Sequence, residues 1–320
     1  MIKVGIIGGA GYTAGELIRI LLHHPGIELE FIHSSSQNGQ AITKVHRDLL
    51  GETDLLFTDA LIFDVDVLFL CSGHGKSRLF LQEYKIPQSV KIIDLSNDFR
   101  IEAPDHAFVY GLPEANKALI AAANYIANPG CFATAIELAF LPLAAKQLLT
   151  DELHITAITG STGAGQMSTQ TSHFSWKNNN VSVYKAFEHQ HLAEIKQTLK
   201  HNNSSLPAVN FIPVRGNFSR GIMAICYSNS SLSLDAAKKM YQEFYRKHPF
   251  VVLSDENPDV KQVVNTNKCV LYLEKHGNKL MIISVIDNLL KGASGQAVQN
   301  MNLLFGLDEH TGLQIKPVAF

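Results

Sequence analysis

One cysteine stands where a helix is predicted to begin. Asn128, Pro129 and Gly130 predict a sharp turn immediately before Cys131, and the apolar pattern that follows predicts a helix. At a helix N-terminus the first-turn amides and the positive end of the helix dipole favour thiolate over thiol, and the thiolate is the reactive form. A buried cysteine without a chemical role is the alternative that this position alone leaves open. Cys131 is therefore a candidate nucleophile.

Two histidines and two acids lie close together further along the chain. The segment from Phe187 to Ile195 contains Glu188, His189, His191 and Glu194. Histidine is the usual acid or base near neutral pH, and a histidine paired with a cysteine can deprotonate the thiol or protonate an oxyanion. A solvated helix start is the alternative, and a metal site is ranked lower because no third ligand of suitable spacing follows. We expect acid/base chemistry and no metal.

A glycine-rich turn joins the first predicted strand to a helix that Pro25 stops. Gly9, Gly11 and Ala14 fit the dinucleotide-binding pattern, in which small residues let the backbone approach a pyrophosphate at a helix N-terminus. Tight packing alone is the alternative explanation of such a turn. The residues expected to bind the cofactor here are Gly8, Gly9, Ala10, Gly11, Tyr12, Thr13 and Ala14.

The end of the second predicted strand indicates which dinucleotide is bound. His33 is followed by Ser34, Ser35 and Ser36, where an NAD-specific protein usually carries an acid for the ribose 2′-hydroxyl. Hydroxyl groups can serve a 2′-phosphate, although the arginine expected beside one is missing from this stretch. We therefore expect NADP, with the three serines among its contacts.

The pattern of apolar residues predicts two domains. Short apolar runs alternate with helical patterns at first, which predicts a parallel sheet covered by helices, and longer alternating strands then predict an antiparallel sheet. Residues 275–279 are predicted to form a hairpin turn, and residues 175–182 and 202–205 are predicted to be surface loops. The domain boundary falls near Cys131, and a helix at about 295–305 can pack on either domain. The expected strands are 2–7, 27–32, 67–70, 91–95 and 125–127, then 155–159, 209–214, 221–227, 269–274 and 280–286.

Composition excludes several classes of protein. The chain has 320 residues, 46% of them hydrophobic, which is enough for two cores, and its formal net charge of -2 offers no footprint for nucleic acid or an anionic membrane. The four cysteines form no CxxC pair, which favours a reducing compartment. Glu137, Pro142 and Lys146 interrupt the most apolar helical pattern. We expect a cytoplasmic enzyme with a small-molecule substrate and neither a nucleic-acid nor a membrane partner.

Taken together, these motifs resemble the N-acetyl-gamma-glutamyl-phosphate reductases, the NADPH-dependent enzymes of arginine biosynthesis. The resemblance spans nearly the whole chain and is far more specific than any single motif. The segments that carry it are 8–16, 94–100, 110–114, 128–131, 160–165, 189–195, 220–221, 287–292 and 295–300.

The resemblance implies a fold, a reaction and site residues. The implied fold is an α/β Rossmann-type parallel-sheet domain, residues 1–130, plus an α+β catalytic and dimerisation domain with a mixed or antiparallel sheet of the glyceraldehyde-phosphate dehydrogenase type, residues 131–291. The C-terminal helix, about 292–320, would return to the first domain, and the protein would be a homo-oligomer, a dimer or tetramer. Cys131 would form a thioester from an acyl phosphate, one of His189 and His191 would act as acid/base, and Glu194 would orient it.

Further residues are candidates for contacts with the cofactor and the substrate. Arginine offers a fork for phosphate or carboxylate, and serial amides in a glycine and serine turn can form an anion nest. A structural ion pair and a tight turn are the corresponding alternatives. The substrate candidates are Arg100, Asn128, Ser161, Thr162, Gly163, Tyr184 and Arg220, and Asn288 is a further cofactor candidate.

The chain departs from commoner forms of the family in ways that bear on the substrate. Gln190 and Gln166 stand where arginine is frequent, and Ala193, Phe132 and Ala133 also differ. These changes bear on the anion contacts and on the acyl group, which is acetyl by default and could be succinyl. The alternatives are an enzyme resembling aspartate-semialdehyde dehydrogenase and a non-catalytic NADP-binding regulator.

Overall fold

The computed structural model describes residues 1–166 and 170–318, and contacts within the chain divide it into two compact units. The first unit comprises residues 1–129 and 293–314, and the second comprises residues 130–292 and 315–320. The segment expected to return to the first domain, 292–320, is therefore split between the units. Its last described residues belong to the second unit because Asn265 Nδ2 donates to the Lys316 carbonyl and Val318 N–H donates to the Val264 carbonyl.

The first unit is built on a parallel sheet with the strand order β2-β1-β3-β4-β6-β5. Every strand pair in this sheet is parallel, as the alternation of apolar runs and helices predicts. The short β5 was not anticipated, because two residues carry no detectable period. The strands are β1 Ile2–Ile7, β2 Ile27–His33, β3 Val67–Leu70, β4 Lys91–Asp94, β5 Val109–Tyr110 and β6 Tyr125–Ala127.

Helices complete the first unit. α4 and α9 pack against each other, and α9 is buried throughout although five of its residues are polar or glycine. The helices are α1 Tyr12–Leu22, α2 Ile42–Val45, α3 Lys76–Glu83, α4 Pro113–Ala122 and α9 Gly295–Leu304. A π-helical turn at Leu290–Ser294 precedes α9.

The second unit contains a seven-stranded sheet with the order β11-β12-β13-β10-β7-β9-β8. The sheet is mixed rather than antiparallel, because β7 pairs with β9 and β11 pairs with β12 in parallel. Each parallel pair needs a long connection: the segment between β7 and β9 contains helices, and a long loop joins β11 to β12. The predicted hairpin instead joins β12 directly to the antiparallel β13. The strands are β7 Leu153–Thr159, β8 Ser182–Val183, β9 Val209–Arg215, β10 Ile222–Asn229, β11 Val251–Leu253, β12 Cys269–His276 and β13 Lys279–Ile286.

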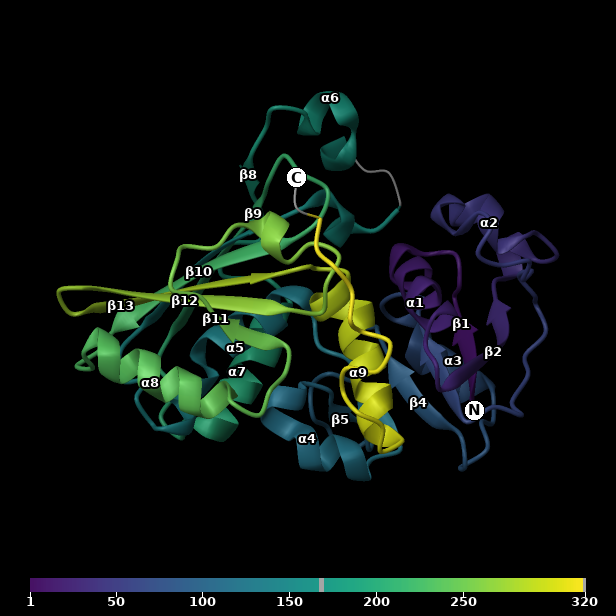
Figure 1. Ribbon diagram of the computed structural model, residues 1–320, viewed down its shortest axis with the longest axis horizontal. Coiled ribbons are helices and arrows are strands. Elements are labelled where there is room, and N and C mark those ends of the chain that lie inside the picture. The colour runs from purple at the N-terminus through teal and green to yellow at the C-terminus, as the bar shows by residue number, and fades with distance from the viewer. Residues whose placement is uncertain (167–169, 319–320) are drawn as a thin grey trace. The chain divides into compact units, whose positions relative to one another are not determined.

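Helices α5, α7 and α8 cover one face of this sheet, and the short α6 lies apart from them (Figure 1). Their bounds are α5 Cys131–Ala145, α6 Phe174–Lys177, α7 His191–Asn202 and α8 Leu234–Tyr245. α5 is buried from Phe132 to Ala144, Glu137 included, and forms the core of the unit, as expected of a helix enclosed by a sheet and two other helices.

α5 continues through Pro142 because a neighbouring helix replaces the lost hydrogen bond. Proline has no N–H, so the Leu138 carbonyl four residues earlier loses its helical partner. Tyr245 Oη of α8 donates to that carbonyl at 2.6 Å, and Tyr241 Oη donates to the Ala139 carbonyl at 2.5 Å.

Across the described ranges, no helix is both long and apolar enough to cross a lipid bilayer.

Candidate active site

Cys131 is the first residue of α5, as the sequence predicts. Gly130 before it is extended, and the Thr134 N–H donates to the Gly130 carbonyl at 2.9 Å, which starts the helix. The Gly130 N–H donates to Glu194 Oε2 at 2.8 Å, and Glu194 is only 3% exposed. A carboxylate of α7 therefore fixes the backbone at the entry to the cysteine helix. The thiol lies where helix amides and the dipole favour its ionised form.

Gly292 leaves the space that the backbone of Cys131 occupies. A Cβ atom at position 292 would lie 2.7 Å from the Cys131 Cβ and 3.1 Å from its Cα. Real Cβ atoms do not approach a neighbour this closely, so a side chain here would displace the cysteine. Gly292 lies in the predicted 287–292 motif, but its spatial relation to Cys131 was not apparent from the sequence.

His189 and His191 lie side by side at the start of α7. Their ring centroids are 4.6 Å apart, and both side chains are buried. His189 Nδ1 accepts a hydrogen bond from the His191 backbone N–H at 3.2 Å, so the proton of a neutral His189 belongs on Nε2. Burial lowers the pKa of His189 to about 4, and the positive charge of Lys185 adds to this effect. His189 is therefore a neutral hydrogen-bond donor at pH 7.

His191 is the histidine that lies near a carboxylate. Its Nε2 lies 3.9 Å from Glu194 Oε1, and both side chains are less than a tenth exposed. A buried negative charge at this distance favours the imidazolium form during a proton transfer. Phe132 packs edge-on against both imidazole rings and ties the pair to α5. The arrangement thus joins a nucleophile candidate, an acid/base candidate and an orienting carboxylate within one unit.

The Tyr184 ring packs beside the His189 ring. Its ring centroid is 5.8 Å from that of His189, and burial raises its pKa, with the nearby Cys131 as the second cause. The Arg215 guanidinium lies 4.5 Å from the centre of the Tyr184 ring. Arg215 was not among the residues singled out from the sequence, although a cation at the carboxyl end of a predicted strand was a usable signal.

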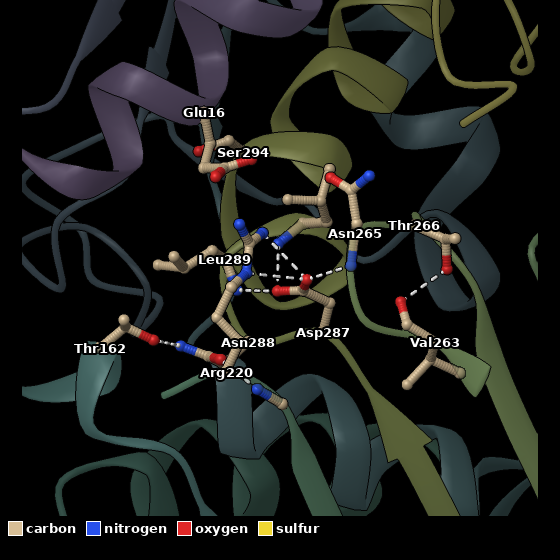
Figure 2. Close-up of polar contacts among 12 residues, drawn as sticks. Glu16, Thr162, Arg220, Val263, Asn265, Thr266, Asp287, Asn288, Leu289 and Ser294 are labelled. Atoms are coloured by element: carbon tan, nitrogen blue, oxygen red, sulfur yellow. Dashed lines mark hydrogen bonds and ion pairs between the residues drawn. The ribbon is translucent and has the colours of Figure 1, made fainter. Parts of the chain in front are cut away.

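One predicted substrate contact, Arg220, is engaged in holding the second unit together (Figure 2). Asp287 is completely buried and accepts hydrogen bonds from the backbone N–H groups of Asn265 and Leu289. Arg220 is ion-paired to the same carboxylate, with Nη2 at 2.9 Å and Nε at 3.1 Å from Oδ2. The arginine fork expected to face an anionic substrate is therefore turned toward an internal carboxylate.

Asn288 also has a structural role in the second unit. Its Oδ1 accepts from the Gly221 N–H at 2.7 Å, and its Nδ2 donates to Thr162 Oγ1 at 3.0 Å (Figure 2). Both ends of the amide thus connect the 160–165 turn to the start of β10. Asn288, which was predicted to contact the cofactor, therefore has both ends of its side-chain amide bonded within the second unit.

The turn that contains Ser161, Thr162 and Gly163 is a 3-10 helix, Ser161–Ala164, rather than an open row of amides. The Ser161 N–H donates to the Phe218 carbonyl and the Thr162 N–H donates to the Ser219 carbonyl, at 2.9 and 3.0 Å. The expected nest is wrong for these two amides, since neighbouring carbonyls already accept their hydrogens.

Arg100 and Asn128 lie in the first unit and position the chain that leads to Pro129. Arg100 Nε donates to the Asn128 carbonyl at 2.8 Å, and its Nη2 donates to the Leu95 carbonyl at 3.1 Å. The Asn128 side chain donates to the Ala293 carbonyl at 3.0 Å and accepts from Asn300 Nδ2 at 3.1 Å. With Arg100 only 5% exposed and Asn128 only 1%, both side chains serve the local backbone.

The turn predicted to bind the dinucleotide requires glycine at position 8. Gly8 has a φ of 82°, and a Cβ there would lie 2.6 Å from the Ser72 nitrogen, so no other residue fits without displacement. The His33 carbonyl accepts the N–H groups of Gly8 and Gly9, and His46 Nε2 bonds the Gly9 carbonyl at 2.7 Å. No side chain accepts a capping hydrogen bond at the N-terminus of α1. Amide groups at such a helix end can donate to an anion.

The serines after β2 lie next to this turn in the sheet. Ser34 Oγ and Ser36 Oγ are 3.5 Å apart, and the Ser34 N–H bonds the Thr58 carbonyl at 2.9 Å. Hydroxyl groups and an uncapped helix N-terminus are suitable donors for phosphates.

Within the described parts of the chain, no three histidine, cysteine, aspartate or glutamate side chains gather as metal ligands, and no disulfide joins the four cysteines.

Comparison with known proteins confirms the fold class. Residues 3–123 match the semialdehyde dehydrogenase NAD binding domain, and residues 131–288 match the semialdehyde dehydrogenase dimerisation domain. Aspartate semialdehyde dehydrogenase II from Vibrio cholerae superposes with a TM-score of 0.73 over 96% of this chain and 99% of that one, at 17% identity. The enzyme from Candida albicans, solved with NADP, gives a TM-score of 0.70 over 95% and 98%, at 14% identity.

Full-length relatives confirm the family resemblance of the sequence. A protein of Parabacteroides distasonis named N-acetyl-gamma-glutamyl-phosphate reductase is 60% identical over 322 residues, and one of Flavobacterium johnsoniae with the same name is 55% identical over 325. Both alignments cover 100% of each chain. The chain therefore belongs to the N-acetyl-gamma-glutamyl-phosphate reductase family.

Proposed function

We propose that this protein reduces an N-acyl-γ-glutamyl phosphate to the N-acyl-glutamate semialdehyde with NADPH, through a thioester on Cys131, in arginine biosynthesis. Family membership at 60% identity over the whole chain supports the reaction. The observation that carries the mechanism is Cys131 at the start of α5, with Glu194 bonded to the preceding N–H and lying 3.9 Å from His191.

The thiolate of Cys131 attacks the acyl carbon, the bond from that carbon to the phosphate oxygen breaks, and phosphate leaves. His191 takes the thiol proton as the attack begins, and the Glu194 carboxylate stabilises the resulting imidazolium. NADPH, when bound, would supply a hydride to the thioester carbon, which leaves the oxyanion of a thiohemiacetal. The carbon–sulfur bond then breaks, the semialdehyde leaves, and His191 returns the proton to sulfur.

His189 contributes a hydrogen bond rather than a proton. Its neutral form, with the hydrogen on Nε2, follows from its lowered pKa and from the bond at Nδ1. A neutral donor in a buried site stabilises an oxyanion without being consumed, and the Cys131 backbone N–H at the helix start is the second donor that we assign to the oxyanion.

The glycine turn and the three serines of the first unit would hold the cofactor. The N-terminus of α1 would bind the pyrophosphate, and Ser34, Ser35 and Ser36 would bind the 2′-phosphate of NADP. We also infer a homo-oligomer, a dimer or tetramer, because the second unit matches a dimerisation domain, and a cytoplasmic location, because the relatives carry the name of a biosynthetic enzyme.

The reverse reaction tests this function with stable reagents. Purified protein receives NADP, inorganic phosphate and one of three aldehydes: N-acetyl-glutamate semialdehyde, N-succinyl-glutamate semialdehyde or aspartate semialdehyde. NADPH formation that requires phosphate and an N-acylated aldehyde is the expected result. Turnover of aspartate semialdehyde alone, or of none of the three by protein that binds NADP, would contradict the proposal.

A further inference from the structure

Three cationic residues lie at or near Tyr184: Arg215 packs over its ring, Lys185 follows it in the chain, and Lys177 is close enough to Arg215 to interact with it electrostatically. Arg215 is the last residue of β9, Lys177 is the last residue of α6, and Lys185 follows Tyr184; we call these three the Arg215 cluster. Arg215 is half-buried and is held in place, because its guanidinium lies over the Tyr184 ring at 4.5 Å and Nη1 donates to Thr171 Oγ1. An arginine fixed in this way is pre-organised for an anion.

The cluster carries positive charge that no acid of the described chain neutralises. None of the three forms an ion pair with an aspartate or glutamate among residues 1–166 and 170–318, and the nearby Glu188 contacts Lys185 only through the backbone. Lys177 donates to the Gly216 carbonyl at 3.0 Å, and its pKa is lowered first by burial and second by Arg215. Mutual repulsion of this kind is relieved when an anion binds.

The position of the cluster indicates which anion it meets. The Tyr184 ring contacts His189 at 5.8 Å and Arg215 at 4.5 Å, so Arg215 is one aromatic ring removed from the reacting groups. The phosphate leaves from the carbon that Cys131 attacks, whereas two methylene groups separate that carbon from the α-carbon of the glutamyl substrate. A carboxylate at the far end of the substrate therefore suits Arg215 better than the leaving phosphate does.

We propose that Arg215, with Lys177 and Lys185, binds a carboxylate at the non-reacting end of the substrate and so determines substrate specificity, an inference that rests on the proposed function. The carboxylate is either the α-carboxylate of the glutamyl group or one carried by the acyl group. Arginine recognises both through the same two-pronged hydrogen bonding.

Trp176, the only tryptophan of the chain, lies next to Lys177 on α6 and reports binding without turnover. The fluorescence of the wild type is titrated with N-acetyl-L-glutamate, N-succinyl-L-glutamate and N-acetyl-4-aminobutyrate, which lacks the α-carboxylate. Arg215→Met should weaken binding of each compound that carries the recognised carboxylate by about 10- to 100-fold, the loss expected for a charge-assisted hydrogen bond. Arg246→Met, which removes an exposed arginine at the end of α8, is the matched control and should bind as the wild type does.

The three ligands separate the two sources of the carboxylate. If Arg215 binds the α-carboxylate, Arg215→Met weakens both glutamates equally and leaves N-acetyl-4-aminobutyrate unchanged. If it binds a carboxylate on the acyl group, only N-succinyl-L-glutamate is affected. In the reverse assay the KM for the semialdehyde should rise with little change in the KM for phosphate, and Arg215→Lys, which keeps the charge, should restore part of the affinity.

Equal dissociation constants and KM values for wild type and Arg215→Met would overturn the inference, as would a rise in the KM for phosphate alone. If Arg215→Met does not fold, Arg215→Lys and Lys177→Met are compared with Arg246→Met in the same titrations, and unchanged affinity in both would overturn it equally. Activity of the wild type on an N-acylated semialdehyde is measured independently, so failure of this inference and failure of the proposed function are distinguishable.

Discussion

Glu194→Gln isolates the charge of the carboxylate that connects the cysteine helix to the histidine pair. Glutamine keeps the shape of the side chain and an oxygen that can accept the Gly130 N–H, now 2.8 Å from Oε2. It removes a negative charge 3.9 Å from His191 Nε2 and points an N–H group toward that nitrogen. The imidazolium is then less stable, and the tautomer with hydrogen on Nδ1 is favoured instead.

The size of the effect follows from Coulomb's law. Two unit charges about 4 Å apart interact by about 4 kcal/mol at an effective dielectric constant of about 20, which is a ceiling for the loss. At about 1.4 kcal/mol per tenfold change, this ceiling corresponds to about 10³-fold in kcat, and we expect a loss of 10²- to 10³-fold. The backbone hydrogen bond survives, so Tm should fall by no more than about 4 °C.

Steady-state kinetics of the reverse reaction and a thermal melt measure both quantities. Glu188→Gln is the matched control, because the same substitution falls on an exposed side chain one residue before His189 and should leave kcat within about twofold. A Glu194→Gln enzyme that kept a third or more of the wild-type kcat with an unchanged melt would refute the role assigned to this carboxylate.

Three further substitutions test other parts of the site. Cys131→Ser should abolish turnover while NADP still binds, as measured by calorimetry, and a fully active variant would exclude the thioester. Gly292→Ala should displace Cys131, which lowers kcat by about 10- to 100-fold and the free energy of unfolding by about 1–3 kcal/mol. Gly26→Ala is the control, because a Cβ there makes only ordinary contacts, and it should have neither effect. Equal kinetics for the two variants would argue against the contact between Gly292 and Cys131. Because His189 titrates at about 4 when folded and about 6.5 when unfolded, the unfolded state binds more protons between these values, so stability falls as pH drops through that window. Between pH 7 and pH 4, the free energy of unfolding measured with denaturant should fall by about 3 kcal/mol less for His189→Asn than for the wild type. An equal fall in both proteins would contradict a neutral, buried imidazole at position 189.

The fold was largely predictable because its strong signals are local. Apolar runs bounded by turns located β1, β3 and β6 to the residue, and the hairpin between β12 and β13 was recognised from its turn residues. The short strands β5, β8 and β11 were not predicted, since segments of two or three residues pair only because neighbouring strands offer them an edge. The parallel pairing of β7 with β9 was also missed, because strand order depends on crossovers that leave no mark on the strands themselves.

The sequence by itself determined the nucleophile candidate, the histidine pair and the phosphate-binding turn. Each is a property of a few consecutive residues: a turn before an apolar helix places Cys131, and glycines between a strand and a helix form the cofactor turn. Such features depend on backbone preferences and helix ends, which neighbouring residues control.

Only the tertiary structure decided which polar groups serve the site and which serve the fold. Glu194 meets the Gly130 N–H from 64 residues away, Arg220 is ion-paired to the buried Asp287, and Arg215 lies over Tyr184. A charged side chain pairs with whichever partner the packing brings within hydrogen-bond distance. Burial stabilises that pair against separation, because an unpaired charge is costly away from water. The partners come from distant segments, so the spacing of residues along the chain does not reveal them.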